Sequence, residues 1–143
     1  MELKTAKLAA STTLHCLTGC TIGETLGLTI GVSLGWNPIS IALFATALAF
    51  VSGFSLTLIP LTLQRGHKVA EAFKLVWVGE VVSIGAMEVA MNGVDYLIGG
   101  MTSGSVFIPY FWVALGISII AGYLAGYPVN YYMLERGIKT KCH

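Results

Sequence analysis

The sequence predicts an all-α, polytopic membrane protein with four transmembrane helices. Three observations lead to this class: the composition, the length of the uncharged segments and the positions of the basic residues. Of 143 residues, 55% are hydrophobic and 10% are charged, whereas a soluble domain carries roughly 25% charged residues. The mean hydropathy is +0.78. This balance argues against a soluble enzyme or a nucleic-acid-binding protein and favours a lipid bilayer as the surroundings.

Two long uncharged segments and their turn signals define the predicted helices. No Asp, Glu, Lys or Arg occurs over 25–64 or over 96–134, and one crossing of the hydrocarbon core needs about 20 apolar residues. Trp-Asn-Pro at 36–38 and a Gly/Ser-rich segment at 99–105 break the two regions. We therefore expect four helices, over roughly 10–35, 39–63, 69–94 and 108–134.

The basic residues predict the orientation in the membrane. All eight lie near the N-terminus, between the second and third predicted helices, or near the C-terminus: Lys4, Lys7, Arg65, Lys68, Lys74, Arg136, Lys139 and Lys141. Cytoplasmic connections of membrane proteins carry the excess of Lys and Arg. We expect residues 1–143 to form one integral domain of the plasma membrane, with both termini cytoplasmic.

Two short motifs recur in the same order and indicate a tandem two-helix repeat. Leu-x-Arg-Gly-x-Lys occurs at 63–68 and 134–139, and Gly-Glu occurs at 23–24 and 79–80. Parallel repeats are a known way to build transport proteins. The alternative is ordinary helix capping combined with the bias of basic residues toward the cytoplasm. The predicted halves cover about 10–66 and 69–137.

Glycine recurs every four residues along the first predicted helix. Such a stripe lets a neighbouring backbone approach closely, so we expect helix packing there, within the chain or in a homo-oligomer. The stripe consists of Gly19, Gly23, Gly27, Gly31 and Gly35.

Soft metal ligands lie beside the glycine stripe. His15, Cys16, Cys20 and Glu24 fall within three turns of one helix. Thiolate and imidazole are ligands of Cu(I) and Zn(II), so these four residues are a candidate metal or substrate site. The alternative is packing, because free cysteine is a common small buried residue.

Two further groups of soft side chains occur. Met87 and Met91, one turn apart in the third predicted helix, could contact Cu(I) or could fill gaps in the core. Cys142 and His143 could bind a metal on the cytoplasmic side or could form a solvated end.

Three carboxyl groups lie at depths that a membrane disfavours. Glu24, Glu80 and Glu88 have no Lys or Arg at their depth, and an unpaired charge costs at least ~2.5–3.5 kcal/mol there. They should be protonated, bind a cation, or bond to neighbours such as Asn92. A duplication would place Glu24 opposite Glu80, and Asp95 is expected at the membrane interface.

The motifs also carry a resemblance. His-Cys-x-x-Gly-Cys-x-x-Gly-Glu at 15–24, Gly-Tyr-Pro-x-Asn-Tyr at 126–131 and the Arg-Gly-Ile-Lys ending resemble a family of small prokaryotic multi-span membrane proteins of unknown function. The resemblance covers nearly the whole chain. It implies a membrane location and a shared site in the first helix, and it implies no activity.

Three functions remain open at this point. The first is a transporter or channel-like carrier for a cation, with a soft metal such as copper as the substrate. The second is a thiol redox protein that exchanges electrons with quinone, and the third is a structural subunit of a membrane complex. Because no nucleophile, base and orienting acid converge, a hydrolase is not expected.

Overall fold

The computed structural model describes residues 2–138 and confirms the all-α class. Its four helices are α1 (Glu2–Ser33), α2 (Pro38–Leu63), α3 (Val69–Ile98) and α4 (Pro109–Glu135). Helix α1 begins at Glu2 and not near residue 10, because residues 2–9 contain no glycine or proline and consist mostly of good helix formers. Helix α3 continues past residue 94 until Gly99, which adopts a left-handed conformation with φ of 95°.

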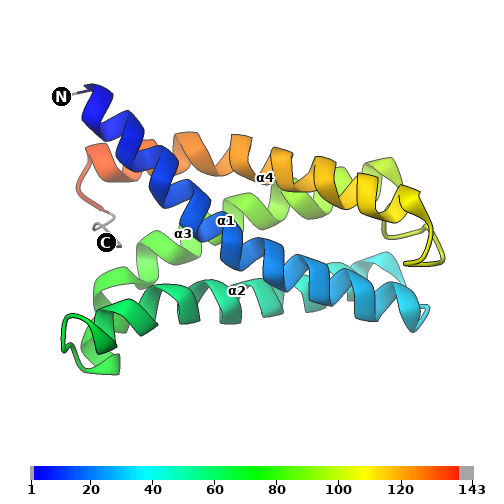
Figure 1. Ribbon diagram of the computed structural model, residues 1–143, viewed down its shortest axis with the longest axis horizontal. Helices are drawn as coiled ribbons and strands as arrows, with labels where there is room; N and C mark the ends of the chain where they lie inside the picture. Colours follow the sequence, from blue (N-terminus) through cyan, green and yellow to red (C-terminus); the bar gives the residue numbers. More distant parts are fainter. Residues whose placement is uncertain (1, 139–143) are drawn as a thin grey trace.

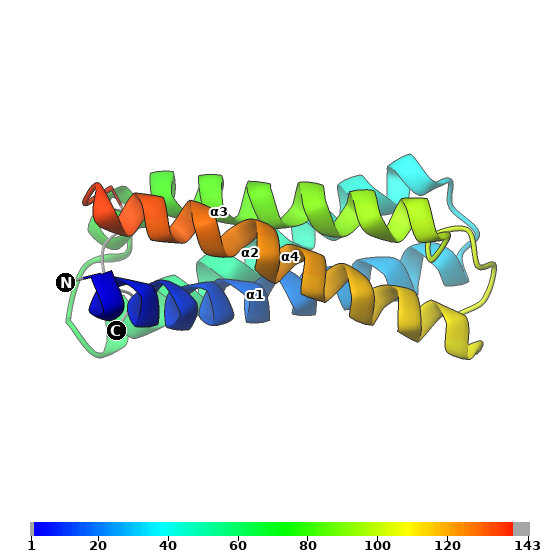
Figure 2. The same ribbon diagram turned by 90° about the horizontal axis from the view of Figure 1, so that it is seen from above.

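The four helices lie along the long axis of the molecule (Figures 1 and 2). The chain reverses direction at each connection, so α1 and α3 run in parallel and α2 and α4 run the opposite way. Helix α1 packs against α2 and α4, and α3 packs against the same two helices from the other side. Helices α1 and α3 also meet across the centre of the bundle, which brings the candidate site residues of both helices together.

The recurring Leu-x-Arg-Gly-x-Lys motif ends a helix in both places. Gly66 and Gly137, the glycines of the two motifs, have φ of 70° and 69°, a region that costs glycine little. The chain turns away there after α2 and after α4. The motif therefore has a capping role in both halves of the chain.

A close contact joins α1 to α2, and we call it the glycine seam. Gly19, Gly23 and Gly27 of α1 lie against Gly53, Ala49 and Ala45 of α2, respectively. A Cβ atom on Gly23 would fall 2.2 Å from the Ala49 backbone nitrogen. Gly31 continues the contact at Ile41, but Gly35 does not, because it lies in the turn after α1 with nothing within 4 Å of its Cβ position.

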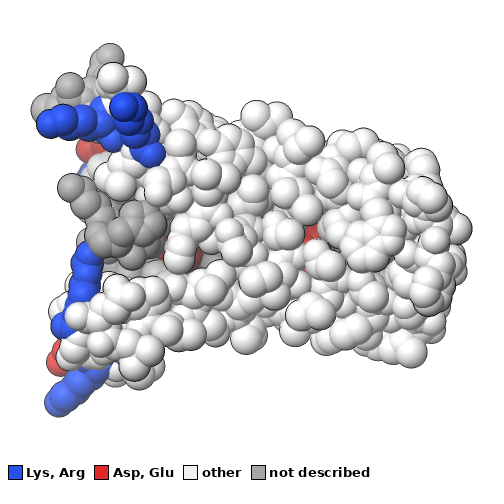
Figure 3. All heavy atoms as spheres, in the orientation of Figure 1, with Lys and Arg blue, Asp and Glu red and all other residues white. Residues whose placement is uncertain are grey.

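The outer surface is apolar over most of its length. Figure 3 shows the Lys and Arg side chains gathered at one end, while acidic atoms elsewhere show only through narrow gaps. Large apolar side chains are exposed between the ends, for example Leu43, Val51 and Val89. Helices α2 and α4 are long and apolar enough to cross a membrane.

Candidate functional site

The face of α1 that carries Cys16, Cys20 and Glu24 is turned toward α3. A spacing of four residues keeps these side chains on one side of the helix, next to the glycine seam but directed into the bundle. Helix α3 presents acidic and sulfur side chains in return. We call this set the polar file, and its members are Cys16, Cys20, Glu24, Glu80, Met87, Glu88 and Asp95.

The first contact of the file joins Cys16 to Glu80. The Cys16 Sγ donates to the Glu80 carboxylate at 3.7 Å from Oε2 and 3.9 Å from Oε1. Both side chains are 1% exposed. A thiol and a carboxylate this close allow the thiol proton to pass to the carboxylate when the sulfur binds something else.

The second contact joins two sulfur atoms. The Cys20 Sγ lies 3.8 Å from the Met87 Sδ, and both side chains are fully buried. Gly126 of α4 provides the room for Met87, because a Cβ atom at Gly126 would fall 2.2 Å from the Met87 Cε. Met91 is also buried but packs against Gly122 of α4, and it forms part of the same central core cluster.

The third contact involves Glu24 and Glu88. Glu24 is 0% exposed, and its carboxyl group shares a side-chain hydrogen bond with the carboxyl group of Glu88. It interacts electrostatically with the carboxyl groups of Glu88 and Asp95. Two acids thus lie near a third one in the interior, where a negative charge on one disfavours a charge on the others.

Glu88 has more hydrogen-bond partners than Glu24. Its Oε2 accepts hydrogen bonds from Thr46 Oγ1 of α2 at 3.3 Å and from Asn92 Nδ2 at 3.1 Å. The Glu88 carboxyl also shares hydrogen bonds with the side chains of Glu24 and Cys20. Asn92 was expected as a polar neighbour of the buried acids, and the structure places it there.

The expected pairing of Glu24 with Glu80 is wrong. Cys16 and Glu80 are 64 residues apart, and Glu24 and Glu88 have the same separation. The Gly-Glu motifs, at 23–24 and 79–80, are only 56 residues apart (24 to 80). Residues of α1 and α3 that lie at the same level are therefore 64 residues apart, whereas the motifs are 56 residues apart. The difference of eight residues is about 12 Å along a helix, so the two Gly-Glu motifs lie at different levels of the bundle.

Asp95, which was expected at the membrane interface, lies in the last turn of α3 and faces the interior of the bundle. Its side chain is 1% exposed, and its carboxylate accepts a hydrogen bond from the Met101 backbone N–H. It lies against Gly100, where a Cβ atom would fall 2.3 Å from Oδ1. The signal in the sequence is its spacing: Asp95 follows Glu88 by seven residues, which is nearly two full turns, and so lies on the same face.

His15 is not a member of the polar file. His15 is half-buried and precedes Cys16, which puts it on a neighbouring face of α1. Within residues 2–138, no group of three or more His, Cys, Asp and Glu side chains is placed to hold a metal ion. Cys142 and His143 lie outside the described residues.

The polar file runs along much of the bundle. From Glu80 to Asp95 it extends about 22 Å along α3, at 1.5 Å per residue. Thiol, thioether and carboxylate groups follow one another at intervals of one to two turns. Such a file offers successive positions for a proton or a cation.

Comparisons with known proteins place the chain in a family. No curated protein matches the chain, and no solved structure matches it. One family model, described as Domain of unknown function (DUF4396), matches residues 5–139. This match spans almost the whole sequence, and the chain therefore belongs to the DUF4396 family.

Proposed function

We propose that this protein is a multi-pass plasma-membrane carrier that moves a cation along the polar file, with Cu(I) as the cation. In this proposal all four helices span the bilayer and both termini are cytoplasmic. The helices have 32, 26, 30 and 27 residues. At 1.5 Å per residue each is longer than a hydrocarbon core of about 30 Å.

The distribution of charge supports the membrane location. The six basic residues within residues 2–138 gather at one end of the bundle (Figure 3), which is the arrangement that the positive-inside rule produces. Helices α1 and α3 are less apolar than α2 and α4, but Glu24, Glu80, Glu88 and Asp95 turn inward. Four helices of this kind can present an apolar surface to lipid while keeping a polar interior.

We also propose that the two helical hairpins, α1–α2 and α3–α4, arose by duplication. Helices α1 and α3 run in parallel, as a parallel repeat requires. Helices α2 and α4 each begin with a proline and contain one more in the interior, Pro60 or Pro128, and each is followed by a left-handed glycine of the shared motif. The shifted level of the Gly-Glu motifs means that the halves diverged in how their first helices pack.

The observation that carries the proposal is the buried carboxyl of Glu24, whose hydrogen-bond partner is a second buried acid, Glu88. Leaving such a group in the membrane interior costs at least ~2.5–3.5 kcal/mol when it is charged. Two carboxyl groups that share a hydrogen bond in the interior cannot both be charged at low cost, so the pair holds a proton or a cation. A carboxyl that takes up and releases a proton or a cation is what a cation carrier needs.

The sulfur atoms favour a soft metal. Cys20 and Met87 supply a thiolate and a thioether, which are the ligands that select Cu(I). Structural Zn(II) sites require four ligands in a tetrahedron, and the described residues do not converge in that way. When Cu(I) replaces the proton of Cys16, the Glu80 carboxylate is in position to accept that proton.

Cu(I) uptake into proteoliposomes tests the proposal. We expect the purified wild-type chain to support uptake and Glu24→Gln to abolish it, while the variant still inserts and keeps its helix content. Glu71→Gln is the matched control, because Glu71 is an exposed glutamate in the first turn of α3, outside the file. Uptake by Glu24→Gln at the wild-type rate would refute the assignment.

Bound copper tests the choice of metal separately. We expect the reduced chain to bind Cu(I) and the double variant Cys20→Ser/Met87→Leu to lose at least ten-fold in affinity. Met91→Leu is the control, because Met91 is as buried as Met87 but the contact of Cys20 is with Met87. Equal affinity in the double variant and the wild type would mean that the cation is not held by this sulfur pair.

A further inference from the structure

A groove between α3 and α4 opens on the outer surface near the basic end of the bundle, and we call it the α3–α4 groove. Its volume is about 460 Å³. Val78 and Val82 of α3 line one side, and Tyr132 and Met133 of α4 line the other. Val82 and Tyr132 are half-exposed whereas Met133 is buried, so the groove is open outward and has an apolar floor. In a bilayer such a groove faces the lipid chains.

Basic side chains lie at the end of each wall of this groove. Lys74 precedes Val78 by one turn, and Arg136 follows Tyr132 by one turn, so each continues the line of a wall. Both basic side chains are exposed. The Arg136 guanidinium carbon lies 5.2 Å from the centroid of the Tyr132 ring, a cation–π contact that holds the guanidinium at the groove. Arginine in such a position suits a phosphate group.

The acidic residues of this region lie farther from the groove lining. Glu135 directly precedes Arg136, and a turn of 100° per residue directs it to another face of α4. Glu71 precedes Val78 by seven residues, or about 10 Å along α3. The charged groups nearest to the lining residues are therefore the two basic ones, and they favour an anionic occupant.

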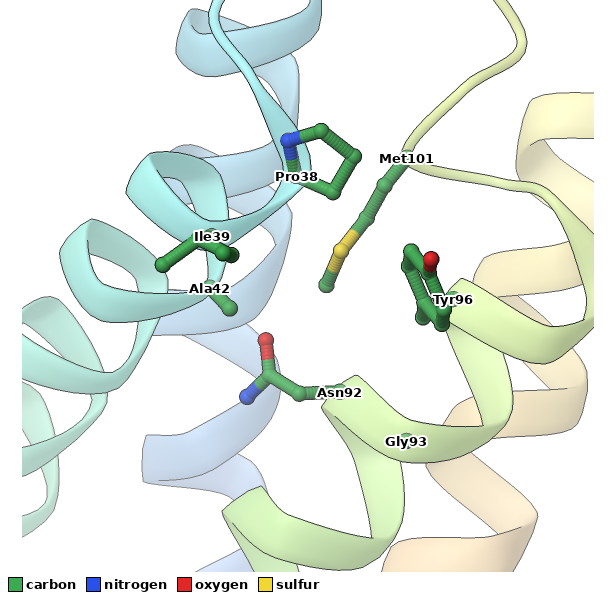
Figure 4. Close-up of a pocket in the computed structure, with 7 residues that line it drawn as sticks. All are labelled: Pro38, Ile39, Ala42, Asn92, Gly93, Tyr96 and Met101. Atoms are coloured by element: carbon green, nitrogen blue, oxygen red, sulfur yellow. The ribbon is translucent and has the colours of Figure 1, made fainter.

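Another hollow, between α2 and α3, shows what the basic residues add. It lies at the other end of α3 (Figure 4), and none of its lining residues is Lys or Arg. Its one ring is that of Tyr96, and the positions one turn before and after are Asn92 and Gly100. Both hollows are open and mostly apolar, but only the α3–α4 groove pairs an apolar floor with a site for a negative charge.

We propose that the α3–α4 groove binds an anionic phospholipid, with its phosphate at Arg136 and Lys74 and one acyl chain along Val78 and Val82. Basic pockets between membrane helices on the cytoplasmic side bind acidic lipid head groups in other proteins. Lys74 and Val82 are separated by about 12 Å along α3, a length that holds the first part of an acyl chain. The proposal rests on the bilayer location proposed above and does not depend on copper as the cation.

Native mass spectrometry of the purified full chain, titrated in detergent with dioleoylphosphatidylglycerol or dioleoylphosphatidylcholine, tests the proposal. The two lipids share their chains and a phosphate, and they differ in net charge. Each Lys or Arg near the membrane surface contributes ~1 kcal/mol, or about five-fold, to the binding of an anionic lipid. We expect the first phosphatidylglycerol to bind at least ten-fold more tightly than phosphatidylcholine. Equal affinity for the two lipids would overturn the proposal.

Two arginine variants distinguish the groove from a general attraction to basic residues. Arg136→Gln should lower the affinity for phosphatidylglycerol about five-fold and leave that for phosphatidylcholine unchanged. Arg65→Gln is the matched control, because Arg65 is the exposed arginine of the other motif copy and has Leu61 where Arg136 has Tyr132. It should leave both affinities unchanged. An equal loss in the two variants, with helix content intact, would overturn the assignment to this groove.

A third pair of variants tests the apolar part of the site. Val82→Trp fills the groove and should lower the affinity for phosphatidylglycerol about five-fold or more, with every basic residue in place. Val89→Trp is the control, because Val89 is exposed on the same helix but does not line this groove. Unchanged binding in Val82→Trp would refute the position of the acyl chain.

Flotation of the full chain with liposomes checks the bilayer location by itself. A chain that floats but shows no preference for phosphatidylglycerol would refute the lipid site alone. A chain that does not float would refute both the lipid site and the proposed membrane location.

Discussion

The two sides of helix α2 differ in how closely the neighbouring helix approaches. On the side toward α1, the glycine seam brings the backbones into contact, and a Cβ atom on Gly23 would fall 2.2 Å from the Ala49 nitrogen. On the side toward α3, a Cβ atom on Gly85 or Gly93 would have nothing within 4 Å. The same residue type therefore marks a close contact on one side and an open groove on the other.

The side of α2 toward α1 contributes mainly to stability, whereas the side toward α3 carries polar groups that can take part in chemistry. On the glycine seam the polar atoms are satisfied: the Ser52 hydroxyl, for example, donates to the Gly19 backbone oxygen at 2.6 Å. On the α3 side, Asn92 Oδ1 is buried without a hydrogen-bond partner among the described residues. Close packing of α1 on α2 fixes the position of the thiols and Glu24, while the looser side leaves room for ligands and for movement.

The largest expected effect comes from filling the glycine seam. Gly23→Ala should lower the free energy of unfolding by about 1–3 kcal/mol or more, because two backbones must separate to admit one methyl group. Reversible unfolding in mixed micelles, followed by circular dichroism, measures the change.

Gly85→Ala is the control on the open side, and its sign should be opposite. It should raise the free energy of unfolding by up to about 0.5–1 kcal/mol, since alanine favours a helix more than glycine does. If both variants destabilised the protein equally, the contrast between the two sides of α2 would be wrong.

Much of this arrangement could be predicted from the sequence. Glycine at intervals of four predicts a close helix contact wherever the stripe lies, and the prolines and glycines between the helices place the turns within a few residues. The three mid-helix glutamates stand out because, apart from Glu71 and Lys74 near the start of the third helix, no other charged residue occurs in the predicted segments 10–35 and 69–94. These signals are local, and each depends only on helical geometry and hydrophobicity.

The level at which one helix meets another could not be predicted. The Gly-Glu repeat predicted that Glu24 faces Glu80. In the structure Cys16 faces Glu80 instead. The level of α3 depends on how its side chains pack against α1 and α4. Gly85 and Gly93 also look like packing residues in the sequence. Only the arrangement of the helices shows that they border a groove.

An intermediate effect is expected where α4 supports the polar file. Gly126→Ala places a Cβ atom against Met87 Cε, a flexible side-chain end that can move. The free energy of unfolding should fall by about 1 kcal/mol, less than for Gly23→Ala. Cu(I) affinity should fall about ten-fold, because the displaced Met87 leaves Cys20. A loss of stability as large as that of Gly23→Ala would show that Met87 is held as rigidly as a backbone.

The smallest effect compares one hydroxyl on each side of α2. Thr46→Val removes the donor to Glu88 Oε2 at 3.3 Å and should lower the free energy of unfolding by about 1 kcal/mol, since Asn92 remains as the second donor. Ser52→Ala removes the bond to Gly19 on the glycine seam and should lower it by about 0.5 kcal/mol, because the backbone contact persists without it. Chemical denaturation of both variants side by side measures the difference. A larger fall in the free energy of unfolding for Ser52→Ala than for Thr46→Val would contradict this comparison. The glycine seam would then depend on its side-chain hydrogen bond rather than on backbone packing. The side toward α3 would depend less on hydrogen bonding than we infer.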